Sequence, residues 1–118
     1  MKRRIGTTQS HKATMQRFSD RVLKIALSIP PGRVTTYGAI ARAAGGGTMA
    51  SQSITTILSK AERAGQKGIP YHRIVYADGR IWVTDASRTK RLALYKKEGI
   101  RIDPKDRIAD FADVLMGF

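Results

Sequence analysis

The sequence predicts a mainly α-helical domain with one small β-hairpin, in the arrangement of a winged helix-turn-helix. Apolar residues recur at helical spacing in several segments, and two short helices are joined by a glycine-rich turn. Two short β-prone runs follow them around a turn signal. A chain of 118 residues can bury one core. We therefore expect a single domain over residues 14–118, preceded by a disordered basic arm over residues 1–13.

The first predicted helix covers Thr14–Ser28, with Thr14 as its N-cap. Its apolar face repeats at helical spacing and consists of Met15, Phe18, Val22, Ile25, Ala26 and Ile29. The sequence Pro30-Pro31-Gly32 ends it, because proline and glycine both interrupt helices.

The next two helices form the predicted helix-turn-helix. Thr35 and Thr36 can cap a short helix over Tyr37–Ala44, which the glycines of residues 45–47 terminate. A third helix runs from Ala50 to Ala64. Its buried stripe consists of Ile54, Ile57, Leu58 and Ala61, and its outward face of Ser51, Gln52, Thr55, Ser59 and Arg63. Short polar side chains allow close approach to nucleic acid, but they are equally typical of an ordinary solvated helix face.

The β-prone runs Arg73–Tyr76 and Arg80–Val83 flank Ala77-Asp78-Gly79, which is a hairpin signal. A helix follows over Thr89–Lys97 and ends at Glu98-Gly99. Its apolar contacts come from Leu92, Leu94 and Tyr95. Asp106–Met116 predicts one more short helix, with Ile108, Phe111 and Leu115 on one side.

The charge of the chain favours a polyanionic partner. Lysine and arginine total 22 against 9 acidic residues, a formal net charge of +13. Up to Ala61 the only carboxylate is Asp20, whereas the last four acids are Asp103, Asp106, Asp110 and Asp113. The positive field therefore belongs to the first half. This distribution favours nucleic acid over a membrane surface or solubility alone.

Several classes of protein are disfavoured by what the sequence lacks. No apolar run approaches the ~20 residues of a spanning helix, and the basic start MKRR precedes no apolar stretch. We expect no membrane association and a cytoplasmic, nucleoid-associated monomer. The chain has no cysteine and only two histidines, so disulfides, a metal site, a cofactor and a thiolate nucleophile are not expected.

Five strings occur in a specific order and spacing. They are Phe18-x-x-x-Val22-Leu23, IPPGRVTTYGAIA from Ile29, IPYHRIV from Ile69, Asp78-Gly79 and Glu98-Gly99-Ile100. Together they resemble the O6-alkylguanine-DNA alkyltransferase family, and within it the alkyltransferase-like proteins. The resemblance covers about residues 18–100. It implies a winged helix-turn-helix that binds the minor groove of double-stranded DNA and flips O6-alkylguanine into a pocket.

The same resemblance places Tyr71 where the enzymes of the family carry their reactive cysteine. His72 and Glu98 occupy the positions of the histidine and glutamate that activate the thiolate. A phenol with a pKa near ~10 is a far poorer nucleophile than a thiolate. The resemblance therefore implies a protein without methyltransferase activity. With no thiol to activate, His72 and Glu98 form either a structural hydrogen-bonded pair or direct ligand contacts.

The resemblance also implies two sets of binding residues. The lesion pocket comprises Tyr71, His72, Arg73, Trp82, Thr84 and Glu98. The DNA-binding set comprises Thr36, Tyr37, Ser51, Gln52, Thr55 and Ser59. Tyr71 walls the pocket unless it is only a core aromatic, and Arg73 is expected to pair with an unidentified carboxylate. Trp82 and Thr84 would share one side of an alternating strand.

Two positions depart from the family pattern. The arginine that enters the base stack is replaced by Gln52 or, in an ungapped match, by Ser51, and a pocket aromatic or arginine is replaced by Thr84.

The leading hypothesis is a non-enzymatic sensor of O6-alkylguanine in DNA that promotes its repair by nucleotide excision factors. The alternative is a general winged-helix DNA-binding or regulatory protein with a decayed lesion pocket. An enzyme with other chemistry on DNA is the weakest hypothesis.

Overall fold

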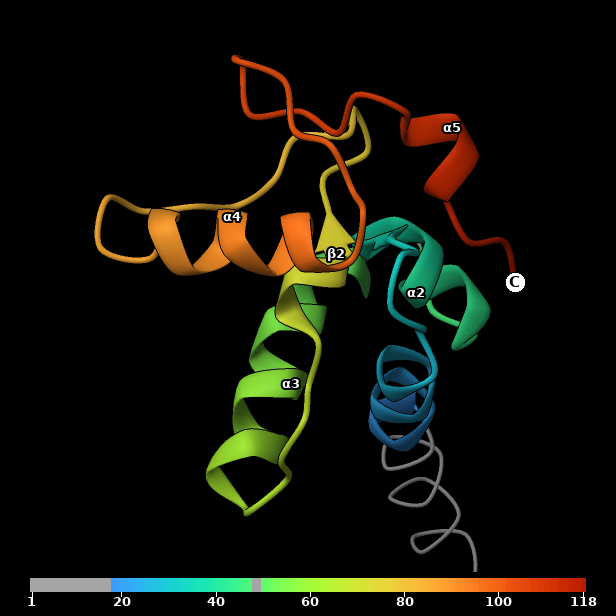
Figure 1. Ribbon diagram of the computed structural model, residues 1–118. Helices are drawn as coiled ribbons and strands as arrows, with labels where there is room; N and C mark the ends of the chain where they lie inside the picture. Colours follow the sequence, from blue (N-terminus) through green and yellow to red (C-terminus); the bar gives the residue numbers. More distant parts are fainter. Residues whose placement is uncertain (1–17, 48–49) are drawn as a thin grey trace, which may run out of the picture.

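The computed structural model describes residues 18–47 and 50–118, and it is mostly helical (Figure 1). The mainly helical fold with a small β element is thereby confirmed. The proposed arm over residues 1–13 and the cap at Thr14 lie outside the described residues. In chain order the elements are a helix over residues 18–27, β1 (Thr35–Thr36), α2 (Tyr37–Ala43), the 3-10 turn η1 (Ala50–Ser53), α3 (Ile54–Arg63), the 3-10 turn η2 (Tyr71–Arg73), β2 (Ile74–Val75), α4 (Arg88–Lys97) and α5 (Phe111–Val114).

The β pairing differs from the predicted hairpin. β2 pairs in parallel with β1, in the register Thr35 to Ile74 and Thr36 to Val75. The turn itself forms, because the Tyr76 N–H donates to the Arg80 carbonyl at 3.0 Å. After the turn, however, the Ile81 N–H donates to the Asp106 carbonyl, so this segment pairs with the C-terminal residues. The segment predicted as the second strand therefore pairs with residues near Asp106, a contact that local sequence patterns do not predict.

The predicted helix-turn-helix is present and its ends follow the expected residues. The Thr36 hydroxyl accepts a hydrogen bond from the Ala39 N–H at 3.1 Å and so caps α2. The predicted third helix begins as η1 and becomes α-helical at Ile54. Ile54 and Leu58 are buried in a cluster with Val22, Ala26 and Ile29 of the first segment. This cluster holds α3 against the preceding helices.

A second buried cluster lies around α4 and the C-terminal segment. It contains Val34, Val75, Ile81, Tyr95, Ile100 and Ile108. Of the apolar contacts predicted for α4, Tyr95 is fully buried, Leu92 packs partly against the cluster, and Leu94 is largely exposed. Leu115 is also exposed, since its backbone rather than its side chain bridges to Val34.

The small sheet lies between the two clusters, and Figure 1 shows it where α2, α3 and α4 come together. Ile74 belongs to the first cluster and its neighbour Val75 to the second. Alternation along this two-residue strand therefore joins the two cores. Within residues 18–47 and 50–118, no helix has both the length and the apolar character needed to cross a membrane.

We predict that Gly46→Ala destabilises the protein by about 1–3 kcal/mol, the usual cost of overpacking. A Cβ at this position would lie 2.4 Å from the Ala50 Cβ and 2.8 Å from Phe18 Cε1. Thermal unfolding of the purified variant measures the effect. Gly47→Ala is the matched control, because a Cβ there meets nothing within 4 Å. Equal stability of the two variants would contradict the packing described for this turn.

Candidate nucleic-acid interface

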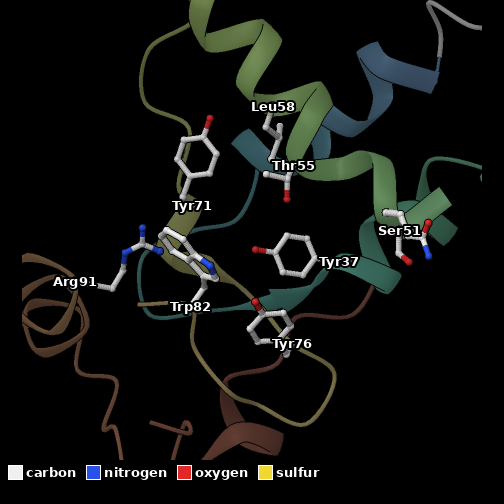
Figure 2. A pocket seen from close by; sticks show the side chains of 9 residues that line it. Tyr37, Ser51, Thr55, Leu58, Tyr71, Tyr76, Trp82 and Arg91 are labelled. Carbon is white, nitrogen blue, oxygen red and sulfur yellow. The ribbon is translucent and has the colours of Figure 1, made fainter. Parts of the chain in front are cut away.

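A cavity of about 620 Å³ opens between α3, the turn after β2 and α4. Its size is typical of a site for a small molecule or a single base. Four of its nine lining residues are aromatic, and the full set consists of Tyr37, Ser51, Gln52, Thr55, Leu58, Tyr71, Tyr76, Trp82 and Arg91. Figure 2 shows the rings of Tyr37, Tyr76 and Trp82 gathered around one space, with Tyr71 beside them. Aromatic walls of this kind can stack on a planar heterocycle.

The aromatic side chains support one another. The rings of Tyr37 and Tyr76 lie 5.9 Å apart at an interplanar angle of 46°. The guanidinium of Arg80 lies 5.3 Å from the Tyr76 ring centroid, and that of Arg91 lies 5.6 Å from the Trp82 ring centroid. Such cation–π contacts restrain rings that would otherwise move freely in solvent. The exposed Trp82 is therefore held at the cavity rather than packed in the core.

Local structure explains how each aromatic residue reaches the cavity. Tyr37 is the first residue of α2, directly after the capping Thr36. Tyr71 begins η2 directly after Pro70, and Tyr76 follows β2 at the start of the glycine turn. The turn at Gly79 requires a positive φ of 86°, which glycine adopts without strain. The three tyrosines thus reach the cavity from three separate ends of secondary-structure elements.

Tyr71 is a neutral phenol at physiological pH. Burial raises its pKa above the ordinary value of 10, and the negative charge of Glu62 raises it further, whereas a hydrogen bond with Ser59 lowers it in part. Burial likewise raises the pKa of Tyr37, with an added contribution from Tyr76. Because a phenol attacks carbon only as its phenolate, both shifts make these tyrosines poorer nucleophiles.

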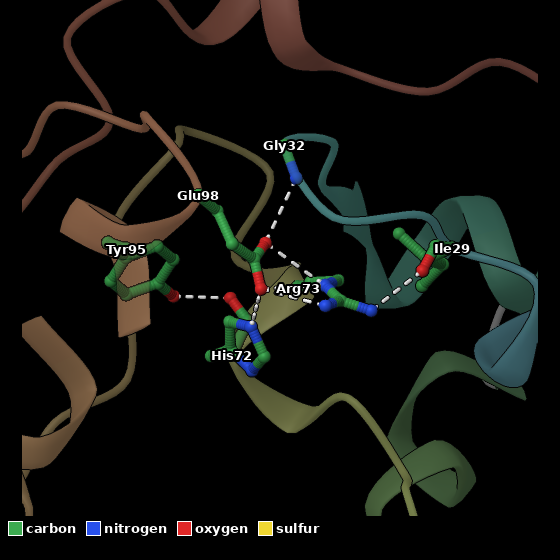
Figure 3. A network of polar contacts seen from close by, with 6 residues as sticks. All are labelled: Ile29, Gly32, His72, Arg73, Tyr95 and Glu98. Carbon is green, nitrogen blue, oxygen red and sulfur yellow. Dashed lines mark hydrogen bonds and ion pairs between the residues drawn. The ribbon is translucent and has the colours of Figure 1, made fainter. Parts of the chain in front are cut away.

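The Glu98 carboxylate is the centre of a polar network that includes His72 and Arg73, the two residues after Tyr71 (Figure 3). His72 Nε2 lies 2.6 Å from Glu98 Oε2, and Arg73 Nη2 donates to the same oxygen at 2.7 Å. The other oxygen accepts the Arg73 Nε–H at 3.1 Å and the Gly32 N–H at 3.0 Å. Arg73 also donates to the Ile29 carbonyl at 3.0 Å. Glu98 is therefore the carboxylate partner that was expected for Arg73.

This network keeps Glu98 ionised. Burial by itself would raise its pKa, but the hydrogen bonds from Arg73, His72 and Gly32 outweigh burial and lower the pKa to about 2. Because an ionised carboxylate can only accept, His72 donates through Nε2. The Tyr95 hydroxyl donates to the His72 carbonyl, and its ring packs edge-on against the imidazole. Both members of the His72–Glu98 pair thus have further contacts within the fold, His72 with Tyr95 and Glu98 with Arg73 and Gly32.

The structure brings together only part of the predicted lesion pocket. Tyr71 and Trp82 line the cavity, whereas His72, Arg73 and Glu98 form the network and are absent from its lining. Thr84 requires a correction: its hydroxyl lies 2.9 Å from the Ser87 hydroxyl and accepts the Ser87 N–H just before α4. The expected alternation of Trp82 and Thr84 does not occur, because residues 81–84 form no regular strand.

The predicted DNA-binding residues also separate into two groups. Tyr37, Ser51, Gln52 and Thr55 line the cavity. The side chain of Thr36 is used to cap α2, and that of Ser59 lies against Tyr71. Their assignment as DNA contacts stays a prediction.

Sequence reasoning missed three cavity residues, Leu58, Tyr76 and Arg91, and Leu58 was expected only in the buried stripe of its helix. Tyr76 ends a β-prone run and was detectable as the residue before a turn that follows IPYHRIV. No sequence pattern indicates Arg91 as a cavity residue, since its position over Trp82 depends on how α4 packs. Within the described residues, no three His, Asp or Glu side chains lie together as a metal site would require.

Four of the eight acidic residues after Ala61, among them Glu98, form ion pairs with arginines. Arg80 binds Asp78, Arg88 binds Asp106 and Arg101 binds Asp110. By contrast, Lys60 and Arg63 of α3 take part in no ion pair with any described residue. Lys60 and Arg63 therefore contribute positive charge on α3, which also carries the negative charge of Glu62.

Comparisons with known proteins agree with this geometry. The model of the "6-O-methylguanine DNA methyltransferase, DNA binding domain" family matches residues 17–100. A "DNA base-flipping protein" of Escherichia coli (strain K12) is 31% identical over 91 residues, which are 77% of this chain and 68% of that protein. A protein of the same name from Shigella flexneri matches equally well.

Solved structures show the same fold. The chain resembles S. pombe Atl1 in a complex with damaged DNA containing O6-carboxymethylguanine, with a TM-score of 0.70 at 21% identity, over 87% of this chain and 97% of that one. A crystal structure of an OGT variant from Mycobacterium tuberculosis matches with a TM-score of 0.52 at 26% identity, over 74% of this chain and 51% of that one.

We predict that Glu98→Gln destabilises the protein at pH 7 by about 3 kcal/mol, since removing one partner of a buried ion pair leaves the other uncompensated. The side chain of Glu98 is only 7% exposed. Because the folded-state pKa of Glu98 is about 2 and its ordinary value is 4.5, its contribution is complete above pH 4.5 and is lost as the pH falls toward 2.

Denaturant unfolding of both proteins across this pH range measures the effect. Glu98→Gln should lack the part of the acid destabilisation that the wild type shows. Asp78→Asn, which breaks an exposed ion pair, is the control and should change stability little at pH 7. If the two variants lose equal stability, the Glu98 network does not organise the fold.

Proposed function

This chain belongs to the family of the 6-O-methylguanine DNA methyltransferase DNA-binding domain, in its alkyltransferase-like branch, and from that premise we propose that it is a non-enzymatic sensor of alkylated DNA. In this proposal the protein binds double-stranded DNA through the minor groove. An O6-alkylguanine leaves the base stack and enters the aromatic cavity beside Tyr71. The name of the E. coli relative and the damaged DNA bound by S. pombe Atl1 support the proposal.

The aromatic cavity is the observation that carries the proposal. Extracting a base from a duplex costs a few kcal/mol, and less when alkylation has weakened its pairing. Stacking on one aromatic residue contributes about 1–3 kcal/mol per base. Tyr37, Tyr71, Tyr76 and Trp82 therefore offer enough stacking surface to offset the cost. A normal guanine has stronger pairing to lose, so the same cavity favours the damaged base.

The chemistry of position 71 supports binding without alkyl transfer. The chain contains no cysteine, and the pKa of Tyr71 is raised by burial, so no thiolate or phenolate is available at neutral pH. The His72–Glu98 pair is engaged with Arg73, Gly32 and Tyr95. We propose that this former activating pair now holds the cavity wall in position.

The face of η1 and α3 supplies the proposed contact with DNA. Ser51, Gln52 and Thr55 lie at the cavity, where the strand next to the extruded base would pass. Gln52 is exposed and can enter the gap left in the stack, although it carries no charge. Ser51 is the other residue available for this role, and it is partly buried. Lys60 and Arg63 add positive charge on the same helix for the phosphates.

A general winged-helix DNA-binding protein remains the second candidate. The observation in its favour is the uncharged Gln52 or Ser51 where an intercalating arginine is expected. Against it stands the retained cavity, since a decayed pocket has no need to keep four aromatic side chains around one space.

We further propose that the bound complex promotes repair by nucleotide excision factors. In this proposal the protein is a cytoplasmic monomer that associates with the nucleoid.

The proposal predicts a preference for lesions that depends on Tyr71. Wild-type protein should bind a duplex with one O6-methylguanine more tightly than the same duplex with guanine. Tyr71→Ala should lose about 1–3 kcal/mol of binding to the lesion and leave guanine duplex nearly unchanged, whereas Tyr71→Phe should retain the preference. Fluorescence anisotropy measures the affinities, and mass spectrometry should show no methyl group added to the protein. Methylation of the protein, or an equal loss for both duplexes, would refute the proposal.

A second prediction concerns the face of α3. Gln52→Arg should strengthen binding to lesion and plain duplexes alike, because a planar cation then enters the stack near the phosphates. Each phosphate contact contributes about −0.9 to the slope of log affinity against log salt, so this slope should become steeper. Gln66→Arg adds the same charge after the end of α3, away from the cavity, and should have a smaller effect. Equal gains from both variants would show that position 52 has no special role.

A further inference from the structure

The cavity holds one cationic side chain that recognition of a neutral base does not require. Arg91 of α4 is the only charged residue among the residues described as lining the cavity. Its guanidinium lies over Trp82, and Figure 2 shows it reaching from α4 toward that ring. Arg91 is partly buried, whereas its neighbour Lys90 is exposed to solvent. The packing of α4 thus turns this arginine into the cavity.

Arg91 has no carboxylate partner within residues 18–47 and 50–118. Other arginines of this half do: Arg73 pairs with Glu98, Arg88 with Asp106 and Arg101 with Asp110. A guanidinium carries five N–H donors in a planar fork that matches a carboxylate. Arg91 is therefore restrained by the Trp82 ring and by a hydrogen bond with the Tyr95 hydroxyl, and its remaining donors can bind an anionic ligand.

We infer that Arg91 selects base adducts whose alkyl group ends in a carboxylate over neutral adducts of the same size. This inference rests on the proposed function, because it takes an extruded guanine as the occupant of the cavity. The aromatic rings would stack on the base, while the guanidinium would bind the acid group through two parallel hydrogen bonds. No carboxylate is among the described lining residues, although the negative charge of Glu62 reaches the lining residue Tyr71.

DNA also offers backbone phosphates as anions. The position of Arg91 over Trp82 within the cavity favours the adduct, whereas Lys60 and Lys90 are exposed and suit phosphates better. The two sources of negative charge have different consequences. A phosphate contact strengthens binding to every duplex, but a contact with the adduct strengthens binding only when the adduct is acidic.

Three duplexes that differ at one base test the inference. The base is O6-carboxymethylguanine, its neutral and nearly isosteric amide O6-carbamoylmethylguanine, or guanine. Wild-type protein should bind the acid about tenfold more tightly than the amide, as expected for charge-assisted hydrogen bonds. Arg91→Gln should remove this ratio while retaining affinity for the amide, and Arg91→Lys should keep part of it. Lys90→Gln is the matched control, which should weaken binding to all three duplexes and preserve the ratio.

Each result decides between the possibilities. An acid-to-amide ratio near one in the wild type, or a ratio unchanged in Arg91→Gln, overturns the inference. Equal weakening of all three duplexes by Arg91→Gln assigns Arg91 to a phosphate and overturns it as well. Failure of the proposed function looks different, because the amide duplex would then bind no better than guanine duplex. Thermal unfolding shows whether each variant is folded, and a folded Arg91→Lys with a reduced ratio supports the inference even if Arg91→Gln does not fold.

Discussion

The carboxylate of Glu98 connects three segments on which the cavity depends. It receives hydrogen bonds from the loop at Gly32, from His72 and Arg73 in η2, and it belongs to the residue that follows α4. Arg73 extends the connection to the Ile29 carbonyl at the end of the first helical segment. Tyr71 immediately precedes His72 and Arg73, so its position follows from this ion-pair network.

The short segment of residues 71–73 therefore contributes both to the Glu98 network and to the cavity. Residues 72 and 73 face the network, while residue 71 faces the cavity. The network positions the aromatic ring of Tyr71, which extends into an existing space rather than into the core. Under the proposed function, this ring binds a base without taking part in alkyl transfer.

Much of the helical fold was accessible from the sequence, because local signals determine it. The cap at Thr36, the glycine turn after α2 and the buried positions Ile54 and Leu58 follow from residue spacing and capping chemistry. The pairing of β2 with β1 was not accessible, since a two-residue strand has no periodicity and its partner lies across the fold. For the same reason Thr84 was misplaced: counting along an assumed strand fails where the chain forms none. Arg91 reaches the cavity through the packing of α4, which spacing alone does not express, whereas Tyr76 was detectable from its place before the turn.

The backbone contacts of Val34 have a consequence for how the chain reaches its native state. Its N–H donates to the Val114 carbonyl, its carbonyl accepts from the Met116 N–H, and the adjacent Arg33 reaches Asp113 across a sequence separation of 80 residues. Closing so long a loop has a large entropic cost, and contacts of this kind slow folding. Helices α2 and α3 can pack early through neighbouring residues, whereas the cluster around Tyr95 must wait for the last segment to return to Val34. We therefore expect the helix-turn-helix to form first along the folding pathway. The side of the cavity that carries Tyr76 and Trp82 should become ordered last.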